Sequence, residues 1–138
     1  MNYKEACKVK EVMAIIRMDM VGKTKDALAA AGFPSITCKK VVGRGKKKVD
    51  FSIIEDYISG SDIVDFSDKK VAEQISEVHR LISKRLIIVL AKDEEVKKVV
   101  DTLIETNRTG NPGDGKIFVI NVTDVVRIRT EETGDEAV

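Results

Sequence analysis

The order of the expected elements constrains this chain more than any single residue, because a strand–helix–strand order occurs twice along it. In the first half, residues 12–17 and 36–42 are β-branched, apolar runs that predict strands. Between them, residues 23–31 are good helix formers with apolar side chains on one face. Gly32 follows directly and is predicted to end that helix as a C-terminal cap.

The second half of the chain repeats this order. Residues 85–91 predict a strand, Asp93 is a candidate N-cap, and a helix follows. The apolar residues of that helix keep helical spacing: Val96, Val99, Val100, Leu103 and Ile104. After a glycine-rich break, residues 116–122 predict the returning strand and residues 125–129 a short final one. Two such units predict a ferredoxin-like α/β sandwich, in which both helices cover one face of a single sheet.

Residues 46–83 separate the two halves and far exceed the usual connection of about 4–6 residues. Within this segment, residues 69–82 space their apolar side chains as a helix would. One interpretation is an ordinary surface helix that completes the domain. The other is a projecting arm that contacts a partner, since long structured loops often serve binding. In either case the 138 residues suit a single domain.

Composition excludes several classes of protein. With six aromatic residues and no Trp, the core must be aliphatic. The clearest apolar run, residues 86–91, is far shorter than the ~20 residues of a membrane span. No signal peptide is recognisable at the N-terminus. Cys7 and Cys38 are not spaced as metal ligands and suit a reducing cytosol, and a hydrolase with a histidine base would depend on His79 alone. No metal site is predicted, and a cytoplasmic location is expected.

The net charge of +1 conceals a division along the chain. Residues 1–48 carry twelve basic and four acidic side chains, whereas residues 49–138 carry twelve basic and nineteen acidic ones. The change is abrupt, because three lysines at 46–48 are followed by a stretch, 49–68, that contains acidic residues and no base. This division argues against a uniformly basic surface for nucleic acid.

Two short glycine motifs do not meet the requirements of the nucleotide-binding motifs that they resemble. Residues 22–24 (Gly-Lys-Thr) look like the end of a P-loop, but Arg17 stands where that motif requires its first glycine. Residues 43–45 (Gly-Arg-Gly) would need a glycine in place of Lys48 to form a dinucleotide fingerprint. Neither motif therefore predicts a nucleotide-binding fold.

The segment 109–116 (Thr-Gly-Asn-Pro-Gly-Asp-Gly-Lys) is more informative. Its three glycines allow backbone N–H groups to converge on an anion, and Lys116 adds a mobile charge suited to phosphate. Arg127 and Arg129 alternate with apolar residues, which predicts two guanidinium groups on one strand face. Two such groups repel each other unless an anion or a carboxylate lies between them. These residues include no nucleophile, base or metal cage, so they predict polyphosphate binding without catalysis.

These motifs identify a family resemblance. Residues 109–119, followed by Val-Arg-Ile-Arg-Thr at 126–130, resemble the C-terminal signature of the PII signal-transduction proteins. The resemblance extends over residues 11–136 except for the middle of the arm. Gly-Phe-Pro-Ser at 32–35 is similar to the nitrogenase-regulating branch, encoded among the nitrogen-fixation genes of methanogenic archaea. The long arm resembles that of the second of the two paired subunits in this branch.

The resemblance implies a trimer of ferredoxin-like subunits with an enlarged T-loop at 46–83 and nucleotide clefts between the subunits. ATP or ADP would be bound by the residues that match the nucleotide site of the family: Thr37, Lys46, Leu90, Gly113, Asp114, Gly115, Lys116, Arg127 and Arg129. 2-Oxoglutarate would be bound by Lys84, with Gly113 and Lys47 beside it. The implied function is that of a cytoplasmic regulator, not an enzyme, whose T-loop contacts control nitrogenase. It would act as a homotrimer or together with a sister PII-type subunit.

Two positions depart from the family pattern. Lys47 stands where the family usually has Gln, whose amide oxygen meets Mg²⁺. An ammonium group has no acceptor, so any Mg²⁺ would be held mainly by phosphates, 2-oxoglutarate and water. Tyr57 lies in the region of the modified tyrosine of the family but lacks its Tyr-Arg-Gly context, so no nucleotidylation is predicted there.

Three other functions stay open at this stage. A PII-type sensor could act on another target, such as glutamine synthetase or an ammonium transporter, although residues 49–67 lack the tip Arg that channel plugging requires. An RNA-binding ferredoxin-like module is a more distant alternative, because among the predicted strands only Phe118 is available to stack on a base. A small ATPase is the third.

Overall fold

The structure is a computed structural model that describes residues 7–45 and 81–138. The helix predicted at 69–82 falls outside the described residues, apart from its last two positions, and Lys46 and Lys47 also fall outside them. Two units are distinguished along the chain: Met1–Val41 together with Lys84–Val138, and Val42–Ser83. The first unit contains both described α-helices and most of the sheet.

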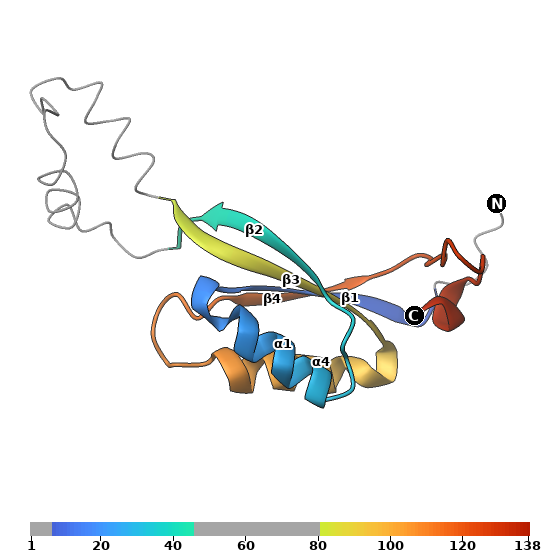
Figure 1. The fold of residues 1–138 in the computed structure, drawn as a ribbon, viewed down its shortest axis with the longest axis horizontal. Helices are drawn as coiled ribbons and strands as arrows, with labels where there is room; N and C mark the ends of the chain where they lie inside the picture. Colours follow the sequence, from blue (N-terminus) through green and yellow to red (C-terminus); the bar gives the residue numbers. More distant parts are fainter. Residues whose placement is uncertain (1–6, 46–80) are drawn as a thin grey trace, which may run out of the picture. The chain divides into compact units, whose positions relative to one another are not determined.

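One four-stranded sheet organises the first unit (Figure 1). Its strands are β1 (Val9–Arg17), β2 (Thr37–Gly43), β3 (Ile82–Lys92) and β4 (Lys116–Asn121), in the spatial order β2-β3-β1-β4. The central strand β1 runs antiparallel to both β3 and β4. The two halves of the chain therefore interleave within one sheet, which confirms the ferredoxin-like arrangement.

The helices α1 (Val21–Ala30) and α4 (Val96–Asn107) lie side by side on the same face of the sheet (Figure 1). The core between helices and sheet uses every second residue of the two central strands, as the period of two in a strand requires. Its buried members are all aliphatic: Val12, Ala14, Ile16, Leu28, Ile87, Val89, Ala91, Val99 and Leu103. The expectation of an aliphatic core is thereby confirmed.

The opposite face of the sheet carries the alternate residues of the same strands, and no described helix covers it (Figure 1). Its apolar side chains include Leu90 on β3 and Phe118 and Ile120 on β4, which are 39%, 46% and 44% exposed. We call this the open face. Three cations also lie on it. Lys84 is six positions from Leu90 on β3, and Lys116 is two positions from Phe118 on β4. Arg17 directly follows the core residue Ile16 on β1 and so points to the open face.

The C-terminus of α1 confirms the predicted glycine cap. Gly32 has a φ of 99° and donates its N–H to the Ala29 carbonyl at 3.1 Å. The next N–H, from Phe33, reaches the Leu28 carbonyl at 2.8 Å. These two bonds form a Schellman motif, which satisfies the last carbonyl groups of the helix.

The start of α4 differs from the prediction, because Asp93 is not an N-cap. Residues Asp93–Glu95 form a 3-10 turn, and α4 begins at Val96. The Asp93 carboxylate instead pairs with the Lys10 ammonium at 2.8 Å. Glu95 accepts the Lys92 N–H at 3.2 Å, so the side chain that stabilises this entry lies two residues further on.

The prediction of a strand at 125–129 is also wrong. Only Val126 makes a bridge, to Thr133, and the chain turns back between these two residues. The Arg127 N–H donates to the Glu132 carbonyl at 2.9 Å, and the Glu131 N–H donates to the Arg127 carbonyl at 2.7 Å. Glu131 adopts a φ of 60°, a left-handed conformation that alternation of apolar and basic residues does not reveal.

Candidate functional site

The glycine loop, residues 109–116, connects α4 to β4, and its point of departure is fixed by a buried polar contact. Asn107, the last residue of α4, donates its side-chain amide to the Thr24 hydroxyl at 3.1 Å and to the Leu103 carbonyl at 3.0 Å. Thr24 lies on α1 and is fully buried. Both helices therefore determine where the loop begins.

Asp114 organises the loop from within. One carboxylate oxygen accepts the N–H groups of Thr109 and Gly110, at 2.8 and 2.9 Å. The other accepts the Thr109 hydroxyl and, at 2.7 Å, Nη1 of Arg17. These interactions, with the Thr109 hydroxyl first and the Arg17 guanidinium among them, hold the pKa of Asp114 well below its usual range. The carboxylate is therefore engaged with the protein itself.

Gly115 brings the loop backbone against the central strand. A Cβ at this position would lie 1.8 Å from the Ile15 carbonyl oxygen, and its φ is 113°. No side chain fits such an approach, and only glycine adopts such a φ freely. The following residue, Lys116, is already the register partner of Ile15 on β1. The glycine thus allows the loop backbone to pack directly against β1 where β4 begins.

Two cations lie beside the loop at the same end of the sheet. Arg17 on β1 and Lys84 on β3 are register partners. Lys84 Nζ donates to the Gly113 carbonyl at 2.8 Å, and Arg17 Nη2 donates to the Pro112 carbonyl at 3.3 Å. Burial, and then the neighbouring Arg17 charge, lower the pKa of Lys84. A second anion near Lys84 would relieve this repulsion.

The remaining donors of the loop suit a bound anion. Among the hydrogen bonds of residues 7–45 and 81–138, none is donated by the N–H groups of Gly113, Asp114 or Gly115. Lys116 is exposed directly after them. Successive N–H groups followed by an ammonium form the kind of cradle that binds phosphate. The described residues contain no group of three or more His, Cys, Asp or Glu that could hold a metal ion.

The structure places two of the expected nucleotide residues away from the loop. Leu90 lies six positions from Lys84 on β3, which corresponds to about 20 Å along a strand. It is nevertheless on the same open face as Lys84. Thr37 is exposed at the start of β2, the strand beside β3. Any ligand that met both Leu90 and the loop would have to extend along the open face.

The two expected arginines are held differently from each other. Arg127 donates Nη1 to the Glu132 carboxylate and Nη2 to the Glu136 carbonyl, both at 3.3 Å. Arg129 is exposed within the turn. The two therefore do not share a regular strand face as predicted. The Glu132 carboxylate lies beside Arg127, but no described hydrogen bond or ion pair connects it to Arg129, so it does not lie between the two arginines as the sequence argument required.

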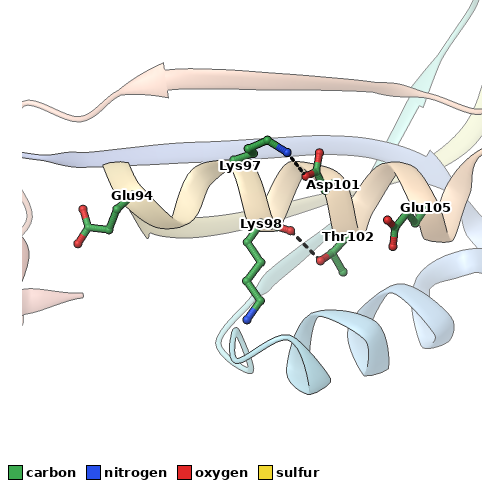
Figure 2. A pocket seen from close by; sticks show the side chains of 6 residues that line it. All are labelled: Glu94, Lys97, Lys98, Asp101, Thr102 and Glu105. Carbon is green, nitrogen blue, oxygen red and sulfur yellow. Dashed lines mark hydrogen bonds and ion pairs between the residues drawn. The ribbon is translucent and has the colours of Figure 1, made fainter.

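A hollow of about 420 Å³ lies elsewhere, along the outer side of α4 (Figure 2). Its lining residues are charged or polar: Glu94, Lys97, Lys98, Asp101, Thr102 and Glu105. Lys97 and Asp101 form an ion pair at 2.5 Å, one helical turn apart (Figure 2). Because charges of both signs lie along one exposed helix face, this hollow is a solvated surface. It contains none of the expected site residues.

Comparison with known proteins connects this geometry to a family. The family model "Nitrogen regulatory protein P-II" matches residues 9–132, which include the glycine loop, Lys84 and both arginines. The chain belongs to the PII family. The resemblance inferred from the glycine loop and the Val-Arg-Ile-Arg-Thr run is thus confirmed.

Curated relatives refine this placement within the PII family. The chain is 42% identical over 133 residues to "Nitrogen fixation nifHD region GlnB-like protein 2" of Methanothermococcus thermolithotrophicus, covering 94% of this chain and 98% of the relative. It is 38% identical over 130 residues to the protein of the same name in Methanobacterium ivanovii, covering 94% and 99%. These names confirm the resemblance to the nitrogen-fixation branch and to its second member.

A solved structure agrees with the fold. The chain aligns with Arabidopsis thaliana PII bound to citrate at a TM-score of 0.69 and 29% identity, covering 96% of this chain and 94% of the other. The sandwich described above is therefore the PII fold. Among the described residues, no helix has the length and apolar character needed to span a membrane.

Arg17 is the residue of this site that the sequence argument did not assign. Its role depends on a partner 97 positions away, Asp114. One signal was available: a carboxylate among glycines that are predicted to bind an anion calls for a cation nearby to neutralise it. The end of the first strand was a position from which Arg17 could supply it.

Proposed function

We propose that this PII protein senses adenine nucleotides and 2-oxoglutarate and controls nitrogenase through contacts of its arm. The observation that carries the proposal is the glycine loop, whose available N–H groups at 113–115 lie beside the cations Lys84 and Lys116. A polyphosphate matches such a cradle, since backbone donors and a mobile ammonium are its usual partners. The names of the nitrogen-fixation relatives support the choice of target.

In this proposal the nucleotide phosphates meet the backbone of Gly113, Asp114 and Gly115. The other nucleotide-binding residues surround the phosphates and the base: Thr37, Lys46, Leu90, Lys116, Arg127 and Arg129. The nucleotide would have to extend along the open face, because Leu90 pairs with Glu11 and Lys116 pairs with Ile15, four positions apart on β1. Leu90 would contribute its backbone near the adenine, while the loop and the cations hold the phosphates.

2-Oxoglutarate is placed at Lys84, with Gly113 and Lys47 as neighbours. Lys84 has an ammonium group whose hydrogen bond to a carbonyl leaves two N–H donors for a carboxylate. The citrate-bound relative from Arabidopsis is consistent with a small carboxylate in this family. Any Mg²⁺ would be held mainly by ligand oxygens, because Lys47 offers no acceptor.

The assembled form is proposed to be a trimer, either of this chain alone or with a sister subunit. The open face exposes Leu90, Phe118 and Ile120, and an apolar surface of this kind marks a protein contact. Clefts between subunits would complete the site beyond the loop of one chain. The proposed setting is the cytoplasm. Sedimentation analysis of the wild type and of Phe118→Asp tests the assembly, and a wild type that remains monomeric would contradict it.

Calorimetric titration with ATP, with and without 2-oxoglutarate and Mg²⁺, tests the ligands. We expect ATP to bind and 2-oxoglutarate to change its apparent affinity by a factor of roughly 5–150, the range of ordinary coupling between sites. A failure of ATP to bind, by this chain alone or with its sister subunit, would overturn the proposal.

Lys84→Ala separates the two ligands. The substitution should abolish the effect of 2-oxoglutarate while leaving most of the ATP affinity, because the phosphates are proposed to bind the backbone of residues 113–115 and Lys116. Lys98→Ala, on the outer face of α4, is the matched control for loss of one positive charge. Equal loss of both ligands in Lys84→Ala would mean that the two subsites are wrongly divided.

Binding to nitrogenase components tests the target. We expect association that depends on the nucleotide and on 2-oxoglutarate, because a ligand that contacts two arm conformations differently changes which one predominates. Glutamine synthetase serves as the comparison partner. Ligand-dependent binding to that enzyme and not to nitrogenase would redirect the proposal to another target.

A further inference from the structure

Asp114 presents an apparent contradiction within the anion site. It stands between Gly113 and Gly115, whose N–H groups are proposed to receive phosphate, yet its side chain is itself an anion. A free carboxylate at this position would repel a polyphosphate at short range. The loop can serve an anion only if that charge is neutralised or directed elsewhere.

The structure shows which groups bind this carboxylate and stabilise its charge. The Asp114 carboxylate has four described donors. Three come from the first two residues of the loop: the N–H and hydroxyl of Thr109 and the N–H of Gly110. The fourth is Nη1 of Arg17 on β1. Arg17 is the only cation among them, and its 2.7 Å contact has the length of a strong charge-assisted bond. The pair is three-quarters buried on both sides, with exposures of 28% and 25%.

Arg17 also holds the loop at a second point. Its other terminal nitrogen, Nη2, donates to the Pro112 carbonyl at 3.3 Å, and a Cβ on Gly113 would lie 3.3 Å from the same nitrogen. One guanidinium therefore contacts residues on both sides of Gly113. Because its planar donors have a fixed geometry, these two contacts define the orientation of the segment between them.

We propose that Arg17 is a positioning residue for the phosphate loop, which binds the Asp114 carboxylate away from the ligand and so leaves the N–H groups of residues 113–115 free of a competing negative charge. This inference rests on the proposed function, since it concerns the same loop. It assigns Arg17 no contact with the nucleotide. Its effect is transmitted through Asp114 and the Pro112 carbonyl.

The test combines Arg17→Ala, Asp114→Asn and the double variant, with titration of ATP, ADP and inorganic tripolyphosphate. Arg17→Ala should weaken ATP binding roughly tenfold, because the uncompensated Asp114 carboxylate would then repel the phosphates. ADP should be affected less than ATP, because it carries less charge to be repelled. In the Asp114→Asn background, removal of Arg17 should have a much smaller effect, since the carboxylate that it neutralises is gone.

A purely structural role predicts a different pattern. ATP and ADP would then weaken equally, and Asp114→Asn would not suppress the effect of Arg17→Ala; either result overturns the proposal. Arg17→Lys keeps the charge but not the two fixed donors, so it should recover part of the ATP affinity, and such recovery excludes misfolding as the cause. Amide hydrogen exchange at Thr109 and Gly110 supplies a ligand-free readout, and it should accelerate in Arg17→Ala.

The two proposals fail in distinguishable ways. If the wild type binds none of the three phosphate compounds, the proposed function fails and this role of Arg17 fails with it. If the wild type binds ATP and Arg17→Ala binds it equally well, only the role of Arg17 is overturned. Asp26→Asn on the exposed surface of α1 is the control for loss of a carboxylate elsewhere.

Discussion

The glycine loop at 109–116 and the C-terminal turn at 126–133 both carry groups proposed to bind phosphate, but the protein holds them in different ways. The loop is fixed through its backbone, by the Asp114 carboxylate and by the close approach of Gly115 to β1. The turn is fixed by three backbone bonds, two of which form its single bridge, and by longer side-chain contacts of 3.3 Å. Backbone donors can thus be presented ready for a ligand, while the arginine side chains keep more freedom.

Substitution of Gly115 should have the largest effect, because it acts on the backbone of the better-held region. Gly115→Ala would place a Cβ 1.8 Å from the Ile15 carbonyl, at a φ of 113° that alanine rarely adopts. We expect the free energy of unfolding to fall by about 3 kcal/mol or more, through the combined cost of strain and overpacking. Denaturant unfolding at matched protein concentration measures it.

Gly110→Ala is the matched control for this prediction. Its φ of 85° is also unfavourable for alanine, but nothing lies within 4 Å of the added Cβ. The expected loss is about 1 kcal/mol, the cost of the left-handed conformation alone. Equal losses in the two variants would show that the contact with Ile15 does not restrain the loop.

The pH dependence of the loop gives the second prediction. The folded protein holds the pKa of Asp114 well below its usual range, with the Thr109 hydroxyl as the first cause. Its stabilisation is therefore complete above the unfolded value of about 3.9 and is lost as the pH falls through the lower folded value. Acidification below about pH 4 should reduce the stability of the wild type more than that of Asp114→Asn.

Urea midpoints of the two proteins between pH 7 and pH 3 measure this difference. The gap between wild type and Asp114→Asn should be constant from pH 7 to about pH 5 and should shrink below it. A gap that stays constant down to pH 3 would contradict the role of the ionised carboxylate.

The arginines of the turn give the third prediction. Arg127→Ala should lower ATP affinity roughly tenfold, as loss of one charged hydrogen-bond donor predicts. Glu132→Ala should have a smaller effect, a few-fold, because Arg127 keeps its charge but loses one of the contacts that orient it. In the Arg127→Ala background, Glu132→Ala should then change nothing further. If Glu132→Ala instead tightened binding, the carboxylate would be a competitor of the ligand.

The same contrast explains which parts of the molecule could be predicted from sequence. Strands, helices and the Gly32 cap follow from local periodicity and turn chemistry, so their positions were predicted to within a few residues. The proposal that the loop binds phosphate could also be made from sequence, because its glycines and Lys116 are adjacent in sequence. Asp114 was assigned to the same site, but the direction of its carboxylate was not, because that depends on the distant Arg17.

The turn shows why the other errors arose. Alternation of Val, Arg, Ile and Arg at 126–129 is typical of a strand, and only one bridge forms there because the chain reverses at Glu131. Asp93 has the chemistry of an N-cap, yet its carboxylate forms an ion pair with Lys10 on β1 instead. In both cases a contact or a backbone angle that local sequence does not encode overrode a sound local preference.

Glu131 gives the last and smallest prediction, and it tests how loosely the turn is held. Its φ of 60° costs a non-glycine residue about 1 kcal/mol, whereas glycine adopts this conformation freely but loses more entropy on folding. Glu131→Gly should therefore raise the free energy of unfolding by about 0.5 kcal/mol. Glu131→Ala removes the same carboxylate but keeps the Cβ, and it should give no such gain. If both variants were stabilised equally, the charge of Glu131 and not its backbone angle would be the source of strain in the turn.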